Sequence, residues 1–445
     1  MKVLRLITFI VFFISLSVYN SFGQTADSIW PLNRCIEYAL VQNISIQQSG
    51  LNKEKNMVNL EQSKASRFPS LSGSASGNIS WGKEYNGQTQ EFGDFSSSRN
   101  IGFGINTNVT LYNGFKTENS IKQSQISYEV SLFDTETIKE SVCLNVLDAY
   151  LQVLYAQEQV KNSEEQIEST KGQLILAEER LNLGAISKSD YLLVKSELAS
   201  EQLSLTNAQN LLVSSTLNLK QLMELPINSN FYVEQPLFDK IILHEYELNA
   251  DSVYKLALEI KPRIKSSELS IRNAEIGIDI ARAAYQPKLM LSCGVSTGYA
   301  FGSNLTFDYQ LQNKINPNLG LSLSVPIYQK RQAKSGVSIA KINTDNTQLE
   351  AANARNQLRK EIEQACSDVL AADKKYNASL EQFKAVEEAY QVASEKYKQG
   401  MLNSVDFIVQ KTKLINAESE LLQSKYNLVF SYKILDFYKG KTLNF

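Results

Sequence analysis

The chain has 445 residues, and 43% of them are hydrophobic, which is enough to bury a large apolar surface. Its 45 basic and 47 acidic residues nearly cancel, so the composition excludes a strongly basic nucleic-acid-binding protein. One histidine, His244, is too few for a His-based catalytic triad or zinc set, and no phosphate-binding loop is present. We therefore predict no enzymatic activity, no metal site and no cofactor.

The first segment, residues 1–23, has the pattern of a secretory signal peptide that is removed from the mature protein. Lys2 and Arg5 give it a positive start, and the apolar run over residues 6–18 is too short to span a membrane as a helix. Gly23 supplies a small residue at the cleavage position. The mature chain is therefore predicted to be exported.

The four cysteines are far apart in the sequence and form no C-x-x-C motif, which indicates neither a metal site nor a disulfide framework. They are Cys35, Cys143, Cys293 and Cys366, and we expect them to be small buried hydrophobic residues. A lipoprotein would need a cysteine directly after the apolar run. Cys35 instead follows the polar stretch 31–34, so lipidation is not expected.

Two segments of the mature chain, residues 70–81 and 100–111, alternate between apolar side chains and small or polar ones. The alternation predicts strands with one apolar face and one face of Ser, Gly and Asn, and it returns at residues 288–299 and 318–327. This length and alternation are typical of transmembrane β-barrels. After the signal, no run of 18 apolar residues offers a membrane-spanning helix instead. A soluble sheet with one solvent-exposed face is the alternative.

The segments within the strand pairs, residues 82–99 and 300–317, are expected to be exposed loops that form the extracellular mouth. Trp81 and Tyr299 fall at the predicted strand ends, where aromatic residues anchor barrels at the membrane–water interface. A buried aromatic residue is the alternative at both positions.

A long helix is predicted after each strand pair, over residues 116–183 and 330–399, which contain no proline and are rich in helix-forming residues. A continuous helix over 116–183 would be about 100 Å long, so it must pack against other helices. Gly184 and Gly400 mark the points where each chain segment reverses into a return helix, which ends near residue 224 or 438.

The elements recur because the chain contains two copies of one unit. Gly184 and Gly400 are 216 positions apart, and two further sequence anchors recur at nearly the same offset. The predicted organisation is a first repeat over residues 24–226, a linker over 227–249 and a second repeat over 250–445.

Four strands cannot close a membrane barrel, because the smallest such barrels have about eight. An open strand edge in lipid would leave backbone groups unpaired at a prohibitive cost. Two copies would give a barrel filled by side chains, whereas three copies would leave a lumen. The pattern alone therefore predicts at least two copies.

The order of helix, strand, loop, strand, long helix, tip and return helix, twice over, resembles the TolC-like outer-membrane efflux proteins. Ala257–Pro262 and Ala281–Leu289 resemble the start of the family's second repeat, and Arg180–Gly184 and Tyr397–Gly400 resemble its paired helix-tip motif. The likeness covers roughly residues 32–438. It implies mixed α and transmembrane β structure, in which a homotrimer forms a twelve-stranded β-barrel continued by a long periplasmic α-helical barrel.

The resemblance implies a passive exit duct in the outer membrane of a Gram-negative bacterium, within a tripartite efflux or type I secretion system. Its partners would be the lipid bilayer, a periplasmic adaptor (membrane fusion protein) and an inner-membrane transporter that drives export. Two other interpretations of the sequence are an exported coiled-coil scaffold and a general diffusion porin. The large helical content disfavours the porin.

By the resemblance, the helix tips dock the adaptor, which assigns this role to Gly184, Ala185, Gly400 and Met401. The residues alone predict that the two glycines are helix C-caps with positive φ, an interpretation compatible with docking.

Asp190 and Asp406 lie six residues beyond the tip glycines, and the resemblance implies that they lie near the pore constriction, with Tyr397 as a candidate latch residue. The residues alone predict that both aspartates belong to helix N-cap motifs, and a capping carboxylate can also face a lumen. Leu402 stands where better-known members have a latch arginine, and Val409 replaces a possible second carboxylate.

Overall fold

The computed structural model describes residues 29–88, 90–235 and 249–441. The predicted signal peptide and His244 lie outside these residues. The chain divides into two compact units. The helical unit takes the described parts of Met1–Ile44, Lys139–Val253 and Ile362–Phe445, and the strand unit takes Ser45–Ile138 and Tyr254–Glu361.

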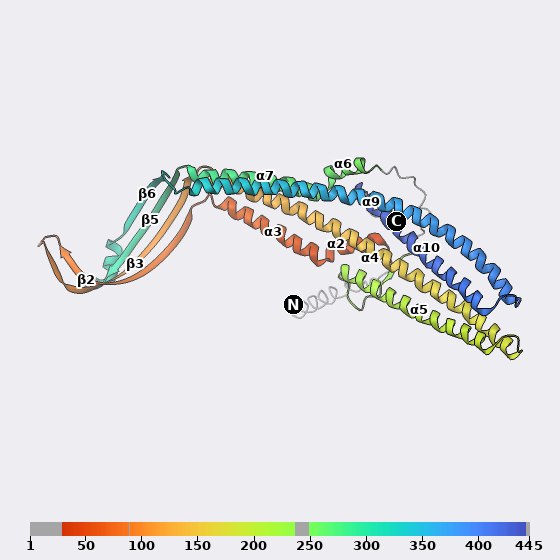
Figure 1. Ribbon diagram of the computed structural model, residues 1–445. Coiled ribbons are helices and arrows are strands. Elements are labelled where there is room, and N and C mark those ends of the chain that lie inside the picture. Colours follow the sequence, from red (N-terminus) through yellow and green to blue (C-terminus); the bar gives the residue numbers. More distant parts are fainter. Residues whose placement is uncertain (1–28, 89, 236–248, 442–445) are drawn as a thin grey trace, which may run out of the picture. The chain divides into compact units, whose positions relative to one another are not determined.

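The strand unit contains one antiparallel sheet of four strands in the order β2-β3-β5-β6 (Figure 1). The strands are β2 (Ser70–Asn86), β3 (Glu91–Tyr112), β5 (Lys288–Ala300) and β6 (Asn316–Ser324). Each repeat thus contributes one strand pair, and β3 and β5 join the two pairs. Among the described strands, β2 and β6 each have a single neighbour, so each keeps one open edge.

The register of the sheet brings the apolar positions of all four strands onto one face. Ile105 lies opposite Gly73 and Val295, and Cys293 lies opposite Thr107 and Leu319. Seven of the large apolar residues on this face are exposed, namely Leu71, Phe103, Ile105, Val295, Leu319, Leu321 and Leu323. The other face carries Ser72, Ser74, Asn106, Asn108, Ser292 and Asn318. An apolar surface of this extent requires a nonaqueous covering.

The predicted loop over residues 82–99 is wrong, because most of it is strand. β2 continues to Asn86 and β3 begins at Glu91, so the turn is short. Pairing between β2 and β3 stabilises the strand conformation here although the residues have low strand propensity. One such contact is a hydrogen bond of 2.7 Å between the hydroxyls of Ser80 and Ser98.

The predicted loop over residues 300–317 is also wrong in part, because it contains the helix α8 (Phe307–Asn313). The side chain of Thr306 caps this helix by accepting a hydrogen bond from the backbone N–H of Tyr309. β6 ends at Ser324, three residues before the predicted end, since Pro326 cannot donate a ladder hydrogen bond.

The long helices are close to their predicted bounds. They are α4 (Lys116–Asn182) and α9 (Gln332–Lys398), and their return helices are α5 (Lys188–Leu222) and α10 (Ser404–Tyr438). The shorter helices are α2 (Leu32–Gln42), α3 (Ile44–Ala65), α6 (Ala250–Ile260) and α7 (Pro262–Arg282), and a 3-10 turn, η2, spans Ala283–Tyr285. No described helix is both long and apolar enough to cross a membrane.

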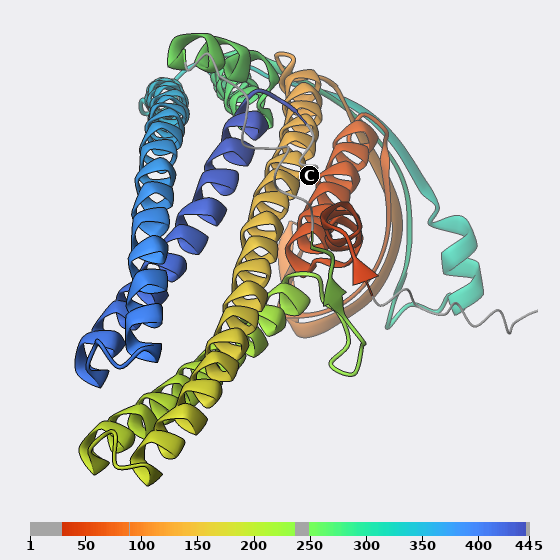
Figure 2. The same cartoon turned by 90° about the vertical axis from the view of Figure 1, so that its right-hand side faces the viewer.

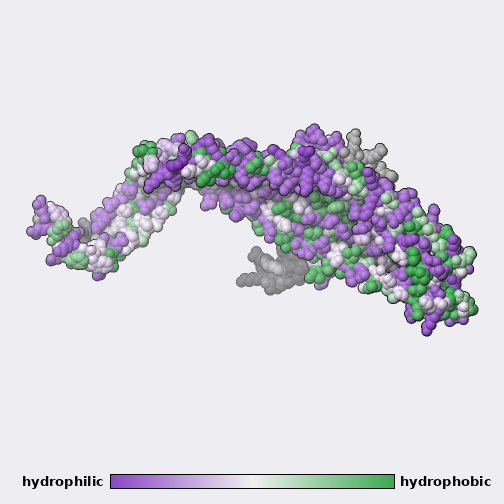
Figure 3. Space-filling model, in the orientation of Figure 1, coloured by the Kyte–Doolittle hydropathy of each residue, from purple (hydrophilic) through white to green (hydrophobic). Residues whose placement is uncertain are grey.

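Polar side chains join the helices of the strand unit. Ser49 on α3 bonds to Thr135 on α4 at 2.9 Å, and Ser266 on α7 donates to the Asp134 carboxylate at 2.6 Å. Hydrophilic residues also predominate on the visible surface along α7 and α9 (Figure 3). Small hydroxyl residues therefore take part in the packing of these helices.

The helical unit is built around large buried side chains that include Leu147, Tyr150 and Leu154 of α4 and Leu428 of α10. Tyr150 also lies under a two-stranded parallel ladder formed by β1 (Ile29–Trp30) and β4 (Tyr232–Val233). Its hydroxyl donates to the carbonyl of Glu234 at 2.9 Å. The predicted linker segment thus contains a short strand that is held by α4.

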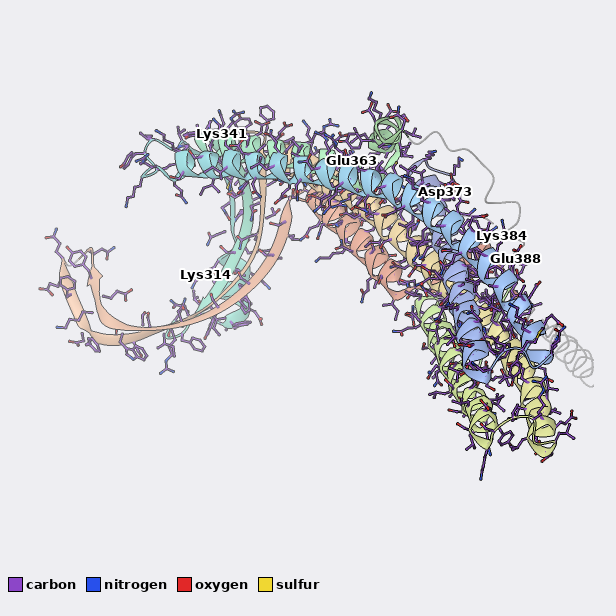
Figure 4. The ribbon with its side chains drawn as sticks, turned by 45° about the vertical axis from the view of Figure 1, so that its right-hand side comes forward. Lys314, Lys341, Glu363, Asp373, Lys384 and Glu388 are labelled. Carbon is purple, nitrogen blue, oxygen red and sulfur yellow. The ribbon has the colours of Figure 1, made fainter. Side chains whose placement is uncertain are left out.

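The charged positions of α9 that belong to the helical unit lie along the helix surface (Figure 4). Glu363, Lys384 and Glu388 are exposed, and Lys384 pairs with Glu381 at 2.9 Å. Exposed pairs one turn apart contribute only a few tenths of a kcal/mol, roughly 0.2–0.5. Buried contacts must hold this unit together.

The cysteines differ from the expectation of uniform burial. Cys35 and Cys366 are buried, Cys143 is half-buried, and Cys293 is exposed on the apolar face of the sheet. Burial raises the pKa of the Cys35 thiol to about 12, so this thiol stays protonated and unreactive.

Candidate functional site

The turn after α4 is a Schellman motif that ends the helix at Gly184. This glycine has φ +73°, a conformation that L side chains rarely adopt. Its N–H donates to the carbonyl of Leu181 at 2.9 Å, and the N–H of Ala185 donates to the carbonyl of Arg180 at 2.8 Å. A Cβ built on Gly184 meets no atom within 4 Å, so backbone conformation alone demands glycine.

The turn after α9 repeats this geometry. Gly400 has φ +77° and donates to the carbonyl of Tyr397 at 3.0 Å, while Met401 donates to the carbonyl of Lys396 at 2.8 Å. A Cβ on Gly400 would again meet open space. The two predicted docking tips are therefore one backbone motif used twice, and no described residue covers the surface above either glycine.

Each return helix starts with a side-chain cap that uses the predicted aspartate. Ser187 accepts from the N–H of Asp190 at 3.1 Å, and the Asp190 carboxylate accepts from the Ser187 N–H at 3.2 Å, which completes a capping box. At the other tip, Asn403 accepts from the N–H of Asp406 at 2.8 Å and donates to its carboxylate at 2.9 Å. The capping interpretation of both residues is thus confirmed.

Asp190 has more partners than a cap requires. The Ser187 hydroxyl donates to its carboxylate at 2.7 Å and lowers the pKa of Asp190 below its ordinary value of 3.8. The Ser187 backbone N–H and the hydroxyl of Ser404 act in the same direction. Ser404 belongs to the second tip, and both residues line the cleft between the tips.

Arg180 provides a second connection between the tips. Its Nη1 donates to the carbonyl of Tyr397 at 2.9 Å and its Nη2 to the carbonyl of Lys398. These carbonyls lie in the last turn of α9, where a positive charge is favourable. The sequence contains one signal for this contact, an arginine four residues before the C-cap glycine. The sequence analysis, however, identifies Arg180 only as part of the helix-tip motif and assigns it no contact with the second tip.

Tyr397 is buried in the tip, with 3% of its surface exposed. Its ring stacks on Phe407 with 4.4 Å between the centroids, and the Arg180 guanidinium lies 5.3 Å from its centroid. Its hydroxyl has no hydrogen-bond partner among the described residues. In this conformation Tyr397 is a packing residue, and a latch role remains a prediction.

A cleft of about 730 Å³ lies between the tips. Its walls include Arg180, Leu402 and Ser404, together with six of the seven predicted tip and constriction residues: Gly184, Ala185, Asp190, Tyr397, Gly400 and Met401. Asp406 is absent from the described lining and is exposed elsewhere on the tip. The structure thus brings the two motifs together around one cleft.

A buried ion pair that the sequence does not predict links the two helix hairpins. Lys411 on α10 and Glu201 on α5 are 2.7 Å apart, with side-chain exposures of 3% and 6%. The hydroxyl of Thr170 on α4 bonds to both charged groups. Helical Lys and Glu residues are usually solvated, so residue type gives no indication of this contact.

The predicted interface aromatics occupy different environments. Trp81 is 68% exposed and lies five residues before the end of β2, so its predicted place at a strand end is wrong because the strand continues. Tyr299 is next to the last residue of β5, and its ring packs against Phe301 and Phe307. Contact with the membrane interface remains a prediction for both.

No group of three or more His, Cys, Asp or Glu residues that could hold a metal ion occurs within the described part of the chain. The residues that line the tip cleft instead carry hydroxyls, amides, one guanidinium, one ammonium and one carboxylate.

The chain combines strands that have one apolar and one hydroxyl-rich face with two long helical hairpins. This combination is that of an outer-membrane channel protein. The chain belongs to the outer membrane efflux protein family, which matches residues 35–224 and 253–440.

The chain is 21% identical over 375 residues to the outer membrane protein TolC of Salmonella enteritidis, covering 77% of this chain and 74% of that protein. It is 23% identical over 409 residues to the cation efflux system protein CusC of Escherichia coli K12, covering 88% and 82%. A crystal structure of CusC has the same fold, with a TM-score of 0.78 at 19% identity and 92% of each chain covered.

The predictions of the efflux family, the fold class and the outer-membrane location are confirmed. The family consists of channel proteins and not of enzymes. The exported scaffold and the soluble sheet, which were alternatives at the level of sequence, are therefore set aside.

Proposed function

We propose that three copies of this chain form a passive exit duct through the outer membrane. The observation that carries the proposal is the four-stranded sheet with two open edges and one exposed apolar face. Three such sheets would provide twelve strands, which is enough to leave a lumen, and would remove every unpaired edge from lipid. The hydroxyl and amide side chains of the opposite face would line that lumen.

The duct would be one component of a tripartite efflux or type I secretion system. A periplasmic adaptor would bind the helix tips and connect the duct to an inner-membrane transporter, which supplies the driving force. Two features support docking at Gly184, Ala185, Gly400 and Met401: the surface above both glycines is open, and the cleft between the tips presents backbone and hydroxyl groups. The relative CusC is a cation efflux system protein, which supports a role of this chain in an efflux system.

The constriction of the duct would lie at the tips, with Asp190 and Asp406 contributing carboxylates and Tyr397 stabilising the narrow conformation. Asp406 is exposed although its cap engages one carboxylate oxygen, so it is available to cations in a lumen. The departures at Leu402 and Val409 predict a latch built differently from that of better-known members. Arg180 would take part in it, since it joins the tips.

Crosslinking of the protein in intact outer membranes tests the assembly. We expect a heat-labile trimer and an ion-conducting pore in planar bilayers whose cation sensitivity changes in the Asp406→Lys variant. Crosslinking that yields only monomers would contradict the trimer. Unaltered conductance and cation block in Asp406→Lys would remove Asp406 from the constriction while leaving the duct intact.

A further inference from the structure

The segment between β5 and β6 folds back onto the sheet. The hydroxyl of Thr297 on β5 donates to the carbonyl of Leu311 on α8 at 2.7 Å. The ring of Tyr299 on the same strand lies 5.3 Å from the ring of Phe307. Residues 301–315 are thus fastened along the strand and do not extend freely beyond its end.

A buried amide fixes this arrangement. Gln310 is 1% exposed, and its side chain donates to the carbonyls of Ala300 and Leu305 at 3.2 and 3.1 Å. Its oxygen accepts from the N–H of Ala300 at 3.0 Å and from Lys314 at 2.7 Å. With all its hydrogen-bonding groups engaged, Gln310 holds α8 in one position against the strand.

The face of the sheet that α8 covers is the apolar one. Thr297 and Tyr299 lie opposite Phe103 and Ile101 in the register, and these residues belong to the apolar set. Figure 2 shows α8 on the convex side of the curved sheet. In a closed barrel the convex side faces outward, so α8 lies on the outer wall and not over the lumen.

The outer surface of this segment is itself apolar. Five large hydrophobic residues are between 43% and 55% exposed, namely Phe301, Leu305, Phe307, Tyr309 and Ile315. They continue the exposed apolar surface of the strands, which the outer-membrane location of the family puts in contact with lipid. Aromatic residues on a short amphipathic helix prefer the boundary between headgroups and acyl chains.

We propose that residues 301–315 form a lipid-contacting collar on the outside of the barrel, with α8 lying in the interface of the outer leaflet. Acyl chains cover the five exposed residues, and the exposed Lys314 and the capped start of α8 lie at the level of the headgroups. The proposal rests on the outer-membrane location and is independent of adaptor docking and of the transported substrate.

Tryptophan fluorescence of the full-length protein in phospholipid vesicles with brominated acyl chains tests this position. The variant Trp81→Phe/Phe307→Trp is compared with Trp81→Phe, so that Trp30 contributes equally to both. We expect bromine near the headgroup end of the acyl chain to quench roughly half or more of the added emission, and bromine near the chain end to quench less. Trp81→Phe/Leu183→Trp, which alters a tip residue 83% exposed, is the control that should show no quenching.

Added emission that resists quenching overturns the proposal. An unquenched emission at long wavelength would place α8 in water at the channel mouth, and an unquenched emission at short wavelength would show that a second copy of the chain covers it. If Phe307→Trp prevents folding, Tyr309→Trp in the same background makes the same comparison. Conductance of the same preparations in planar bilayers tests the duct independently of the collar. A conducting variant whose added emission is not quenched would contradict the collar alone.

Discussion

The two helix tips have the same backbone but different side-chain partners. Both end in a Schellman turn around a glycine with φ above +70°, and both restart with a side-chain cap three residues before an aspartate. However, Arg180 of the first tip reaches the carbonyls that end α9. The side chain of Lys396, 216 positions later, is exposed and makes no hydrogen bond or ion pair among the described residues.

This difference distinguishes the features that both copies of the unit must keep, such as the turn glycine, from the side chains that can differ between the copies. The turn geometry has one chemical solution, a glycine, so it persists in both copies. The charged residues at equivalent positions have diverged. Arg180 of the first tip contacts the second tip, whereas Lys396 of the second tip makes no matching contact with the first. Variants at paired positions can therefore distinguish the shared framework from the asymmetric contacts.

The largest effect is expected at the buried pair that links α5 and α10. Glu201→Leu would leave the Lys411 ammonium buried without its partner, and we expect a loss of about 3 kcal/mol in the free energy of unfolding. The measurement is urea unfolding of the full-length protein at neutral pH, followed by far-UV circular dichroism. The equivalent position of the second repeat, Ala417, is buried without a charge.

The matched control for this pair is Glu201→Leu/Lys411→Met, which removes both charges. Thr170 keeps its hydrogen bond of 2.9 Å to the carbonyl of Gln166, so no polar group is left unpaired by the change. We expect the double variant to recover most of the lost stability. A double variant as unstable as the single one would show that packing, and not the stranded charge, is responsible.

The next largest effect is expected at the asymmetric guanidinium. Arg180→Ala removes two hydrogen bonds to carbonyls of α9 and a contact with the Tyr397 ring, and we expect a loss of about 1–2 kcal/mol. Lys396→Ala is the paired control, with an expected change within about 0.5 kcal/mol because the side chain is exposed. Equal losses in the two variants would refute the asymmetry between the tips.

The features that the sequence predicts well are those set by local rules. Strict alternation locates the cores of all four strands, and the absence of proline with a terminal glycine locates the long helices within two residues. The caps of α5 and α10 follow from Ser187 and Asn403, each three residues before an aspartate.

The features that the sequence does not predict depend on contacts between distant segments. Ladder pairing makes residues 82–86 and 91–99 strand although Ser, Gly and Asn favour a loop. Lys195 and Lys411 occupy equivalent positions, yet the first is exposed and the second is buried against Glu201. Only the position of a neighbouring helix distinguishes them, and residue type carries no information about it.

The tip glycines should show equal, moderate effects. Gly184→Ala and Gly400→Ala each force a Cβ into the left-handed region, with an expected loss of about 1 kcal/mol. Because neither Cβ would clash, the loss should come from backbone strain alone, and Asn at either position should be better tolerated than Ala. Unequal losses measured by urea unfolding would mean that the two turns are not equivalent.

The smallest expected effect is the pH dependence that Asp190 contributes. Because its folded pKa is lowered, its contribution to stability is complete above its ordinary value of 3.8 and declines as the pH falls through the folded pKa. Ser187→Ala removes the hydroxyl that donates to the carboxylate, so the loss of stability between neutral pH and values below 3.8 should become smaller. Ser189→Ala, at an exposed neighbouring position, should leave that dependence unchanged. Unfolding midpoints across this range decide the matter, and an identical pH profile in the Ser187→Ala variant would show that this hydroxyl does not hold the Asp190 carboxylate in its charged form.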